Sequence, residues 1–236
     1  MRIGPVAFDA PFLLAPLAGV SDSPFRRLAR EQGAAGVYTE MVSADGLTRG
    51  SQATLDYCRF EPEERPIGIQ VFGSDPGVMA DAARVLSELP EAARPDLIDI
   101  NMGCPVRKVV NRCAGAALLT DVPRLAQIVA RMRDASTLPV TAKIRLGWDG
   151  QSTNVVEVAR ALEGSGAQAV AIHARTRAEK FEGSAHWEMI GAARPSITAS
   201  QPVVSSIRTA SSGPRTSPLP ITGIETARRA APIISQ

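Results

Sequence analysis

The sequence predicts an α/β protein with the architecture of a (β/α)8 TIM barrel, incomplete and with about six recognisable strands. Short apolar runs alternate with longer amphipathic stretches from Phe12 to about Ile190, a pattern typical of parallel strands joined by right-handed crossovers. Polar residues stand at the C-terminal ends of these runs, where barrel enzymes place their sites. A doubly wound sheet is the alternative, but no GxGxxG motif follows the first run.

The apolar runs give the expected strands, and the amphipathic stretches between them give the expected helices. Three of these stretches carry a proline where the first helical turn would lie, with a serine or an aspartate just before it as a candidate cap. The expected strands are Phe12–Ala18, Gly36–Val42, Ile67–Phe72, Leu97–Asn101, Val140–Arg145 and Ala169–His173. The expected helices lie near Pro24–Gln32, Pro76–Leu89, Val122–Asp134 and Val155–Gly164, with Ser23, Asp75 and Asp121 as the caps.

The composition is that of an ordinary globular protein with one large α/β domain. Hydrophobic residues make up 44% and charged residues 21% of the 236 residues, and the net charge of +2 does not by itself indicate a nucleic-acid-binding protein. Three cysteines without a CxxC pair indicate a reducing compartment rather than a disulfide scaffold. The apolar segment Phe12–Val20 is interrupted by Pro16, is too short to cross a membrane and lacks the flanks of a secretion signal. We therefore expect a cytoplasmic protein without a membrane partner.

The composition changes after residue 193, so we place a domain boundary there. From Pro195 to Gln236, 19 of 42 residues are Ser, Thr or Pro, and aromatic residues, Asp and Lys are absent. Such a segment buries too little surface to offset its ordering entropy. We expect residues 1–193 to form the incomplete barrel, and residues 194–236 to form a low-complexity tail that is disordered or translated out of frame.

The strand ends supply the candidate site residues. Side chains two positions apart on a strand face the same side, and the ends of barrel strands converge on one mouth. We therefore expect an amide, a thiol, an amine and an imidazole to meet there. Gln70 closes the third run, Asn101 and Cys104 the fourth, Lys143 and Arg145 the fifth, and His173 and Arg175 the sixth.

Cys104 is the residue of greatest interest because Gly103 and Pro105 flank it. Glycine permits a tight turn, and proline fixes φ and removes a donor, so the strand stops and the thiol faces a loop. The alternative is a small buried hydrophobic residue, a role that fits Cys58 and Cys113.

The other candidates also have two interpretations. Lys143 lies inside an apolar strand, which is costly unless it meets an anion, so we expect a ligand there. His173 could be a hydrogen-bonded core histidine, and Gln70 and Asn101 could bond only to neighbouring backbone. A solvated face is the simplest role for Arg107, Lys108 and Arg112, with phosphate contact as the alternative. The two histidines of the chain are far apart and lack carboxylate spacing, so we expect no metal site.

Taken in order, these segments resemble the tRNA-dihydrouridine synthases, flavin enzymes that reduce selected uridines in transfer RNA. The similarity covers roughly residues 5–192 and depends most on Asn101-Met102-Gly103-Cys104-Pro105 and His173-Ala174-Arg175-Thr176-Arg177. The other matching segments are Ala15–Asp22 with Phe25-Arg26, Thr39–Val42, Gln70–Gly73, Lys108-Val109, Ala114-Gly115, Lys143–Arg145, Gly147-Trp148, Gly183 and His186-Trp187.

The resemblance implies two groups of site residues. One group would bind FMN: Pro16, Leu17 and Ala18 through backbone contacts, Gln70 at the ring edge, Lys143 near negative charge on the reduced ring, and His173 against flavin or substrate. The other would meet transfer RNA: Asn101 would position flavin and uracil, and Arg145, Arg175 and Arg177 would contact phosphates or bases.

The resemblance also implies the chemistry. NADPH, or NADH, would reduce FMN, a uridine would be turned out of the tRNA stack, and hydride would pass from flavin N5 to uracil C6. Cys104 would be the general acid that gives a proton to C5. A thiol with an ordinary pKa of about 8.5 is mostly protonated at neutral pH, which suits an acid.

Two family segments that would hold the FMN phosphate, a Gly-Asn-Gly-Asp strand end and a later Gly-Arg strand end, do not follow Ala193, nor does the family's helical C-terminal domain. We therefore expect this chain to turn over slowly or not at all. Two alternatives stay open, namely another FMN-dependent barrel oxidoreductase acting on a free pyrimidine and an inactive fragment that binds flavin or RNA. We expect a monomer.

Overall fold

The structure, a computed structural model, describes residues 1–193 and the strand at 203–206. The predicted low-complexity tail therefore lies outside the described residues, except for that strand. The predicted boundary after residue 193 stays a prediction.

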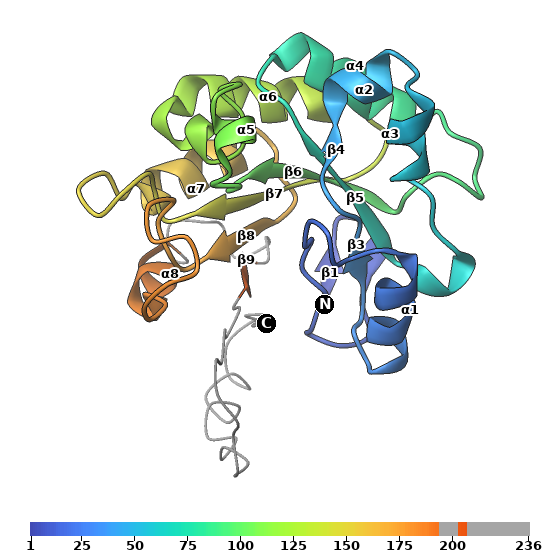
Figure 1. Ribbon diagram of the computed structural model, residues 1–236, viewed down its shortest axis with the longest axis horizontal. Coiled ribbons are helices and arrows are strands. Elements are labelled where there is room, and N and C mark those ends of the chain that lie inside the picture. The colour runs from blue at the N-terminus through green and yellow to red at the C-terminus, as the bar shows by residue number, and fades with distance from the viewer. Residues whose placement is uncertain (194–202, 207–236) are drawn as a thin grey trace.

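A parallel sheet of seven strands forms the centre of the molecule. Its hydrogen-bonded order is β3-β5-β6-β7-β8-β9, with β4 also paired to β5. Figure 1 shows that the sheet curls, with α2, α4 and α6 on its outer side and an opening between α1 and β9, so the described residues form part of a barrel. The strands are β3 (Val37–Tyr38), β4 (Val42–Ser43), β5 (Ile67–Phe72), β6 (Leu97–Met102), β7 (Val140–Arg145), β8 (Val170–His173) and β9 (Val203–Ser206).

Five of the six expected strands lie where the apolar runs placed them, and the first does not form. Within Phe12–Ala18, Leu13 makes only an isolated parallel bridge with Gly36. Pro16 removes one of the N–H donors that a strand at this place would need. The second run is interrupted, because β3 and β4 pair separately with β5 and Thr39 Oγ1 accepts the Gln70 N–H at 3.2 Å.

The expected helices form, and two of the three predicted caps are confirmed. Asp75 accepts the Val78 N–H at 2.9 Å, and Asp121 accepts the Arg124 N–H at 3.1 Å. Ser23 is not a cap: Asp22 accepts the Phe25 N–H at 3.0 Å, and the Ser23 hydroxyl donates to Glu64 instead. The helices are α1 (Ser23–Glu31), α2 (Ala44–Thr48), α3 (Gln52–Asp56), α4 (Pro76–Ser87), α5 (Arg107–Val110), α6 (Val122–Ala135), α7 (Val155–Gly164) and α8 (Trp187–Ala193), with 3-10 turns at Pro62–Glu64 and Gly115–Thr120.

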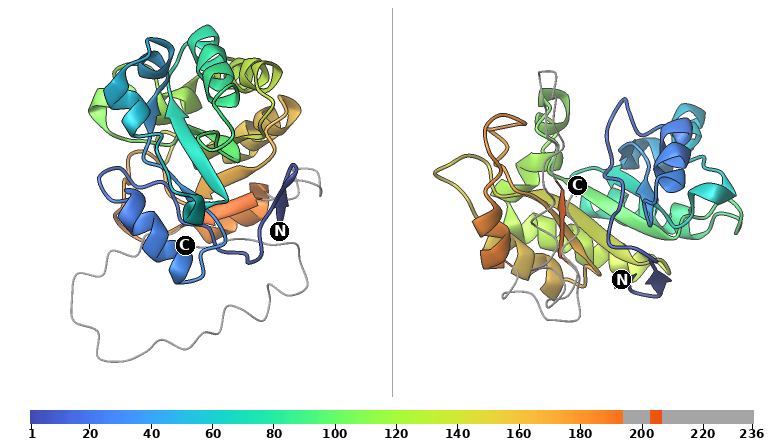
Figure 2. Two further views of the ribbon diagram at one scale, coloured as in Figure 1. Left: turned by 90° about the vertical axis from the view of Figure 1, so that its right-hand side faces the viewer. Right: turned by 90° about the horizontal axis from the view of Figure 1, so that it is seen from below.

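Strand alternation separates an apolar outer face of the sheet from a polar inner face. The outward residues of β5 and β6, such as Ile69, Ile98 and Ile100, are fully buried with α4 and α6 in the main core. Toward the C-terminal ends of β5 to β8, most of the inward residues are polar, and they bring the candidate site together. A small antiparallel hairpin, β1 (Arg2–Ile3) with β2 (Val6–Ala7), precedes the sheet, and Figure 2 shows it from the side and from below. No helix in the described part of the chain is long and apolar enough to cross a membrane.

Candidate active site

A cavity of about 280 Å³ opens at the C-terminal ends of the strands. Sheet register brings its side chains together, because Gln70 is paired with Asp99, Asn101 with Lys143, and Arg145 with His173, on one face of the sheet. Of the predicted site residues, all but Arg175 and Arg177 line the cavity: Pro16, Leu17, Ala18, Gln70, Asn101, Cys104, Lys143, Arg145 and His173.

The loop that carries Cys104 is held on two sides. Asn101 Oδ1 accepts the backbone N–H groups of Gly103 at 3.2 Å and Cys104 at 2.9 Å, and the Cys104 carbonyl accepts the Ala116 N–H at 3.0 Å. Gly115 passes so close that a Cβ there would lie 2.8 Å from the Cys104 carbonyl oxygen. Its φ of +60° is also the left-handed region that favours glycine. The thiol is thus placed by backbone that has little room to move.

The Cys104 thiol is half-buried at the cavity wall. Of the two cysteines expected to be small buried residues, Cys58 is buried, but the expectation was wrong for Cys113, which is exposed. Burial raises the pKa of the Cys104 thiol, while the Val106 N–H and the cations Arg145 and Lys143 act in the opposite direction. The net result keeps the proton on sulfur at neutral pH. A protonated thiol at a cavity wall can donate a proton, which fits the predicted general acid.

Lys143 brings a cationic group into the cavity. Burial, and then the neighbouring Arg145, lower the pKa of Lys143 from 10.5 to about 8, while Asp99 and Cys104 act to raise it. Among the residues that the structure describes, no hydrogen bond or ion pair engages its ammonium group. A desolvated ammonium in this state is stabilised by an anionic or electron-rich ligand.

His173 is neutral in this environment. Burial, followed by the charges of Lys143, Arg145 and Arg175, lowers the pKa of His173 to about 2. Its Nε2 lies 3.2 Å from Nη1 of Arg175, and a guanidinium can only donate, so Nε2 accepts and the ring proton is on Nδ1. His173 is therefore a hydrogen-bonding group here and not a cation.

Arg145 joins the Cys104 loop to a second loop, residues 174–186, that follows β8. Its Nε donates to the Gly103 carbonyl at 2.8 Å, and its Nη1 donates to the carbonyls of Thr176 at 2.9 Å and Lys180 at 2.6 Å. The Arg145 guanidinium also lies 5.2 Å from the centroid of the Phe181 ring. These contacts bring Phe181 to the cavity.

Arg175 and Arg177 have partners within the protein that the sequence did not indicate. Arg175 donates to the carbonyls of Glu182 at 3.0 Å and Gly183 at 2.7 Å, and it is buried. Arg177 stacks 4.2 Å from the centroid of the Trp148 ring. Backbone carbonyls thus engage Nε and Nη1 of Arg145 and Nε and Nη2 of Arg175, and phosphate contact by these two residues stays a prediction that the geometry does not favour.

We expect Arg145→Lys to loosen the 174–186 loop. Lysine cannot reproduce three directed N–H donors to carbonyls in two loops, so the free energy of unfolding should fall by about 2 kcal/mol. Denaturant titration measures this loss, and hydrogen exchange should show reduced protection of residues 174–186. The matched control is Arg131→Lys on the exposed side of α6, which should change neither quantity. Unchanged protection in Arg145→Lys would show that other contacts hold the loop.

A buried ion pair supports the wall formed by Pro16–Ala18. Ser21 Oγ accepts the Leu17 N–H at 3.0 Å, and the Ser21 carbonyl accepts from Arg26 Nη1 at 2.7 Å. Arg26 is paired with Glu64, and both are buried. The backbone of this wall is therefore anchored to the helix α1 and to the 3-10 turn at Pro62–Glu64.

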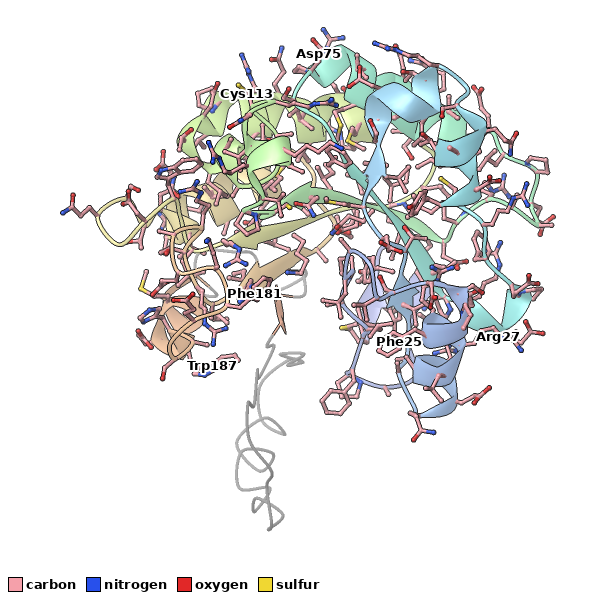
Figure 3. The ribbon with its side chains drawn as sticks, in the orientation of Figure 1. Phe25, Arg27, Asp75, Cys113, Phe181 and Trp187 are labelled. Carbon is pink, nitrogen blue, oxygen red and sulfur yellow. The ribbon has the colours of Figure 1, made fainter. Side chains whose placement is uncertain are left out.

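Sequence reasoning missed several residues of the site, three of which matter for its chemistry. Phe181 and Val106 line the cavity, and Asp99 lies behind Gln70. In Figure 3, Phe181 lies beside β8 toward the middle of the molecule, whereas Trp187 lies on α8 at the periphery. Phe181 had no signal in the sequence because it lies in a loop, but a carboxylate inside the apolar run Leu97–Met102 was a signal for Asp99. In the described part of the chain, no group of three or more His, Cys, Asp or Glu side chains could hold a metal ion.

Comparison with known proteins connects this site to one family. A family model described as dihydrouridine synthase matches residues 13–205. The tRNA-dihydrouridine synthase B of Pseudomonas aeruginosa is 42% identical over 198 residues, which cover 84% of this chain and 58% of that protein. A probable tRNA-dihydrouridine synthase of Treponema pallidum is 42% identical over 195 residues, covering 80% of this chain and 56% of that protein. The chain thus spans less than two thirds of the length of these relatives.

Solved structures with a similar fold include two old yellow enzymes. The homologue from Zymomonas mobilis has a TM-score of 0.56 at 12% identity, covering 89% of this chain and 81% of that chain. The enzyme from Trypanosoma cruzi has a TM-score of 0.55 at 11% identity, with the same coverage. At such low identity these similarities show the fold alone, and they confirm the barrel architecture.

Proposed function

Because this chain belongs to the dihydrouridine synthase family, we propose that it carries the catalytic cavity of an FMN-dependent enzyme that reduces the C5=C6 bond of uridine in transfer RNA. The observation that carries the proposal is the convergence of Asn101, Cys104, Lys143 and His173 on one cavity. These side chains come from three neighbouring strands and the loop after one of them, and their types match the chemistry of a flavin and a uracil ring.

The cavity suits the ring system of FMN. An isoalloxazine ring has flat apolar faces and a polar edge of carbonyl, N–H and ring nitrogen groups. Ala15–Ala18 and Met41 supply an apolar wall, and Gln70, Asn101 and Lys143 supply polar groups at its other side. The ammonium of Lys143 would face the edge that becomes negative on reduction. Bound FMN would supply a hydride to C6 of the uracil.

The chain's own residues would complete the reaction at C5. The protonated thiol of Cys104 would donate a proton to C5, as a general acid on the cavity wall. Asn101 holds the Cys104 N–H and so fixes where the thiol lies. Cofactor reduction by NADPH or NADH is part of the same proposal.

The mouth of the cavity suits an unstacked base. Phe181 is 41% exposed and lies 5.7 Å, ring centroid to ring centroid, from His173. An aromatic side chain at this place would give a base turned out of an RNA stack an apolar surface to contact. Arg177, stacked on Trp148, would lie nearer the RNA backbone.

The test begins with the absorbance spectrum of the purified chain before and after addition of FMN. We expect a shifted flavin spectrum that NADPH bleaches anaerobically, followed by slow formation of dihydrouridine in unmodified tRNA, detected by nucleoside mass spectrometry. Free uracil under the same conditions is the comparison. Reduction of free uracil but not of tRNA would favour a pyrimidine oxidoreductase, and a chain that binds no FMN would contradict the proposal.

A further inference from the structure

Asp99 is a buried carboxylate that lies behind the cavity and not in its lining. Each of its oxygens accepts one hydrogen bond from a neighbouring strand. Oδ2 accepts from Gln70 Nε2 on β5 at 2.6 Å, and Oδ1 accepts from the Thr141 hydroxyl on β7 at 2.6 Å. Asp99 therefore connects three adjacent strands directly beneath the candidate site.

The hydrogen bond between Asp99 and Gln70 determines the orientation of the Gln70 amide. Burial raises the pKa of Asp99, and the hydrogen bonds from Thr141 and Gln70 favour the ionised form. An ionised carboxylate can only accept, so Gln70 turns its NH2 group toward Asp99 and its carbonyl oxygen away. That oxygen accepts from Asn101 Nδ2 at 2.8 Å. The oxygen and the NH2 group of the Gln70 amide are nearly equal in shape. Without the Asp99 carboxylate, no group at the position of Asp99 would favour one orientation over the other.

The orientation of the Gln70 amide in turn favours one orientation of the Asn101 amide. Since its NH2 group is used on Gln70, its Oδ1 faces the loop and accepts the N–H groups of Gly103 and Cys104. The reversed amide would point N–H groups at these two donors and leave both without an acceptor. One carboxylate thus determines two amide orientations and, at the end of the series, the position of the Cys104 backbone.

We propose that Asp99 is a positioning residue, whose carboxylate orients Gln70 and Asn101 and through them holds the loop that carries Cys104. The effect on turnover rests on the proposed function. The effect on the loop does not, because the series of hydrogen bonds is complete within the protein.

The competing explanation is charge compensation. Burial raises the pKa of Asp99 and lowers that of Lys143, and the opposite charge of each residue partly offsets the shift of the other. Two substitutions separate the explanations. In Asp99→Asn, the new Oδ1 can still accept from Gln70 while the new NH2 donates to the Thr141 hydroxyl, so the orientation survives without the charge. In Asp99→Leu, both the acceptor and the charge are lost.

The measurement is the rate at which iodoacetamide alkylates Cys104, followed by mass spectrometry in a Cys113→Ser background without cofactor. Cys113 is exposed and would otherwise react, whereas Cys58 is buried. We expect alkylation about tenfold faster in Asp99→Leu, because the loop loses its acceptor, and within about twofold of the parent rate in Asp99→Asn. Equal acceleration in both variants would assign the effect to charge and overturn the proposal, as would no change in either.

Asp96→Leu is the matched control, because Asp96 is a carboxylate three residues before Asp99 that has different hydrogen-bond partners. It accepts from Arg65 Nη1 and from the Ile67 N–H, both at 2.7 Å, and so holds the start of β5, away from the cavity. It should destabilise the fold without accelerating alkylation. Acceleration equal to that of Asp99→Leu would mean general destabilisation and refute positioning.

Two further readouts cover the remaining outcomes. If Asp99→Leu does not fold, Gln70→Met removes the hydrogen bond between Gln70 and Asn101 and must accelerate alkylation to the same extent. An unchanged rate would overturn the proposal.

In enzyme that forms dihydrouridine, Asp99→Leu should lower kcat about tenfold with little change in KM for tRNA, and Asp99→Asn should keep most of the parent kcat. If the parent chain forms no dihydrouridine, the proposed function fails while the alkylation rates still decide the role of Asp99.

Discussion

Cys104→Ala is expected to lower dihydrouridine formation by about 100-fold to 10,000-fold, because it removes the proposed general acid at C5. Binding of FMN and its reduction by NADPH should stay close to those of the parent chain, since alanine leaves the backbone contacts of Asn101 and Ala116 intact. The measurement is single-turnover formation of dihydrouridine by chain that has been reduced beforehand. Separating this half of the reaction from cofactor reduction isolates the reduction of uridine, which needs both the hydride at C6 and the proton at C5.

Cys113→Ala is the control for Cys104→Ala, because it removes an exposed thiol and leaves the cavity unchanged. It should turn over at the parent rate. Cys104→Ser should retain only a small part of the activity, because a hydroxyl is a much weaker acid than a thiol. Parent-like turnover by Cys104→Ala would move the general acid to another group and contradict this part of the proposal.

Lys143→Met is expected to stabilise the cofactor-free protein while impairing its chemistry. The substitution removes a desolvated cation from the cavity and keeps a chain of similar length, so the free energy of unfolding should rise by about 1 to 2 kcal/mol. Reduction of bound FMN by NADPH should become about 100-fold slower, because charge that develops on the reduced ring loses its cationic partner. Denaturant titration and the anaerobic loss of flavin absorbance measure the two effects.

The pH dependence gives an independent check on Lys143. Its pKa is about 8 in the folded protein and about 10.5 as a free side chain, so between these values the unfolded chain holds the proton and the folded chain has lost it. The stability contributed by this residue therefore rises with pH across that window. The gain in the free energy of unfolding from Lys143→Met should be largest below pH 8 and shrink toward about pH 10.5. If the free energy of unfolding of Lys143→Met differs from that of the parent by the same amount at every pH, the Lys143 ammonium is not desolvated. Arg131→Met serves as an exposed control.

The sequence predicted the strands from β3 to β8 and the main helices because their signals are local. Apolar runs marked the strands, and Asp75 and Asp121 before prolines marked two helix starts. The same locality explains two errors. Pro16 lies in the first apolar run and leaves only a bridge at Leu13, and Ser23 and Asp22 are adjacent candidates of which the structure uses the aspartate.

The site was predicted as a set of residues but not as a set of interactions. Strand-end position was enough to gather Gln70, Asn101, Lys143 and His173 at one cavity. It could not show that Arg145 is occupied by loop carbonyls, because those partners are backbone atoms of a loop whose path has no sequence signature.

The strand order of the sheet has a consequence for synthesis on the ribosome. From β5 to β9, each strand pairs with the one that precedes it in the chain. The N-terminal part of a nascent polypeptide emerges first, so each of these strands leaves the exit tunnel after its partner. All of the described residues that line the cavity are present once Phe181 has emerged, and His186, whose N–H bonds to Ala174, follows five residues later. The growing chain can therefore begin to assemble this cavity while translation continues downstream.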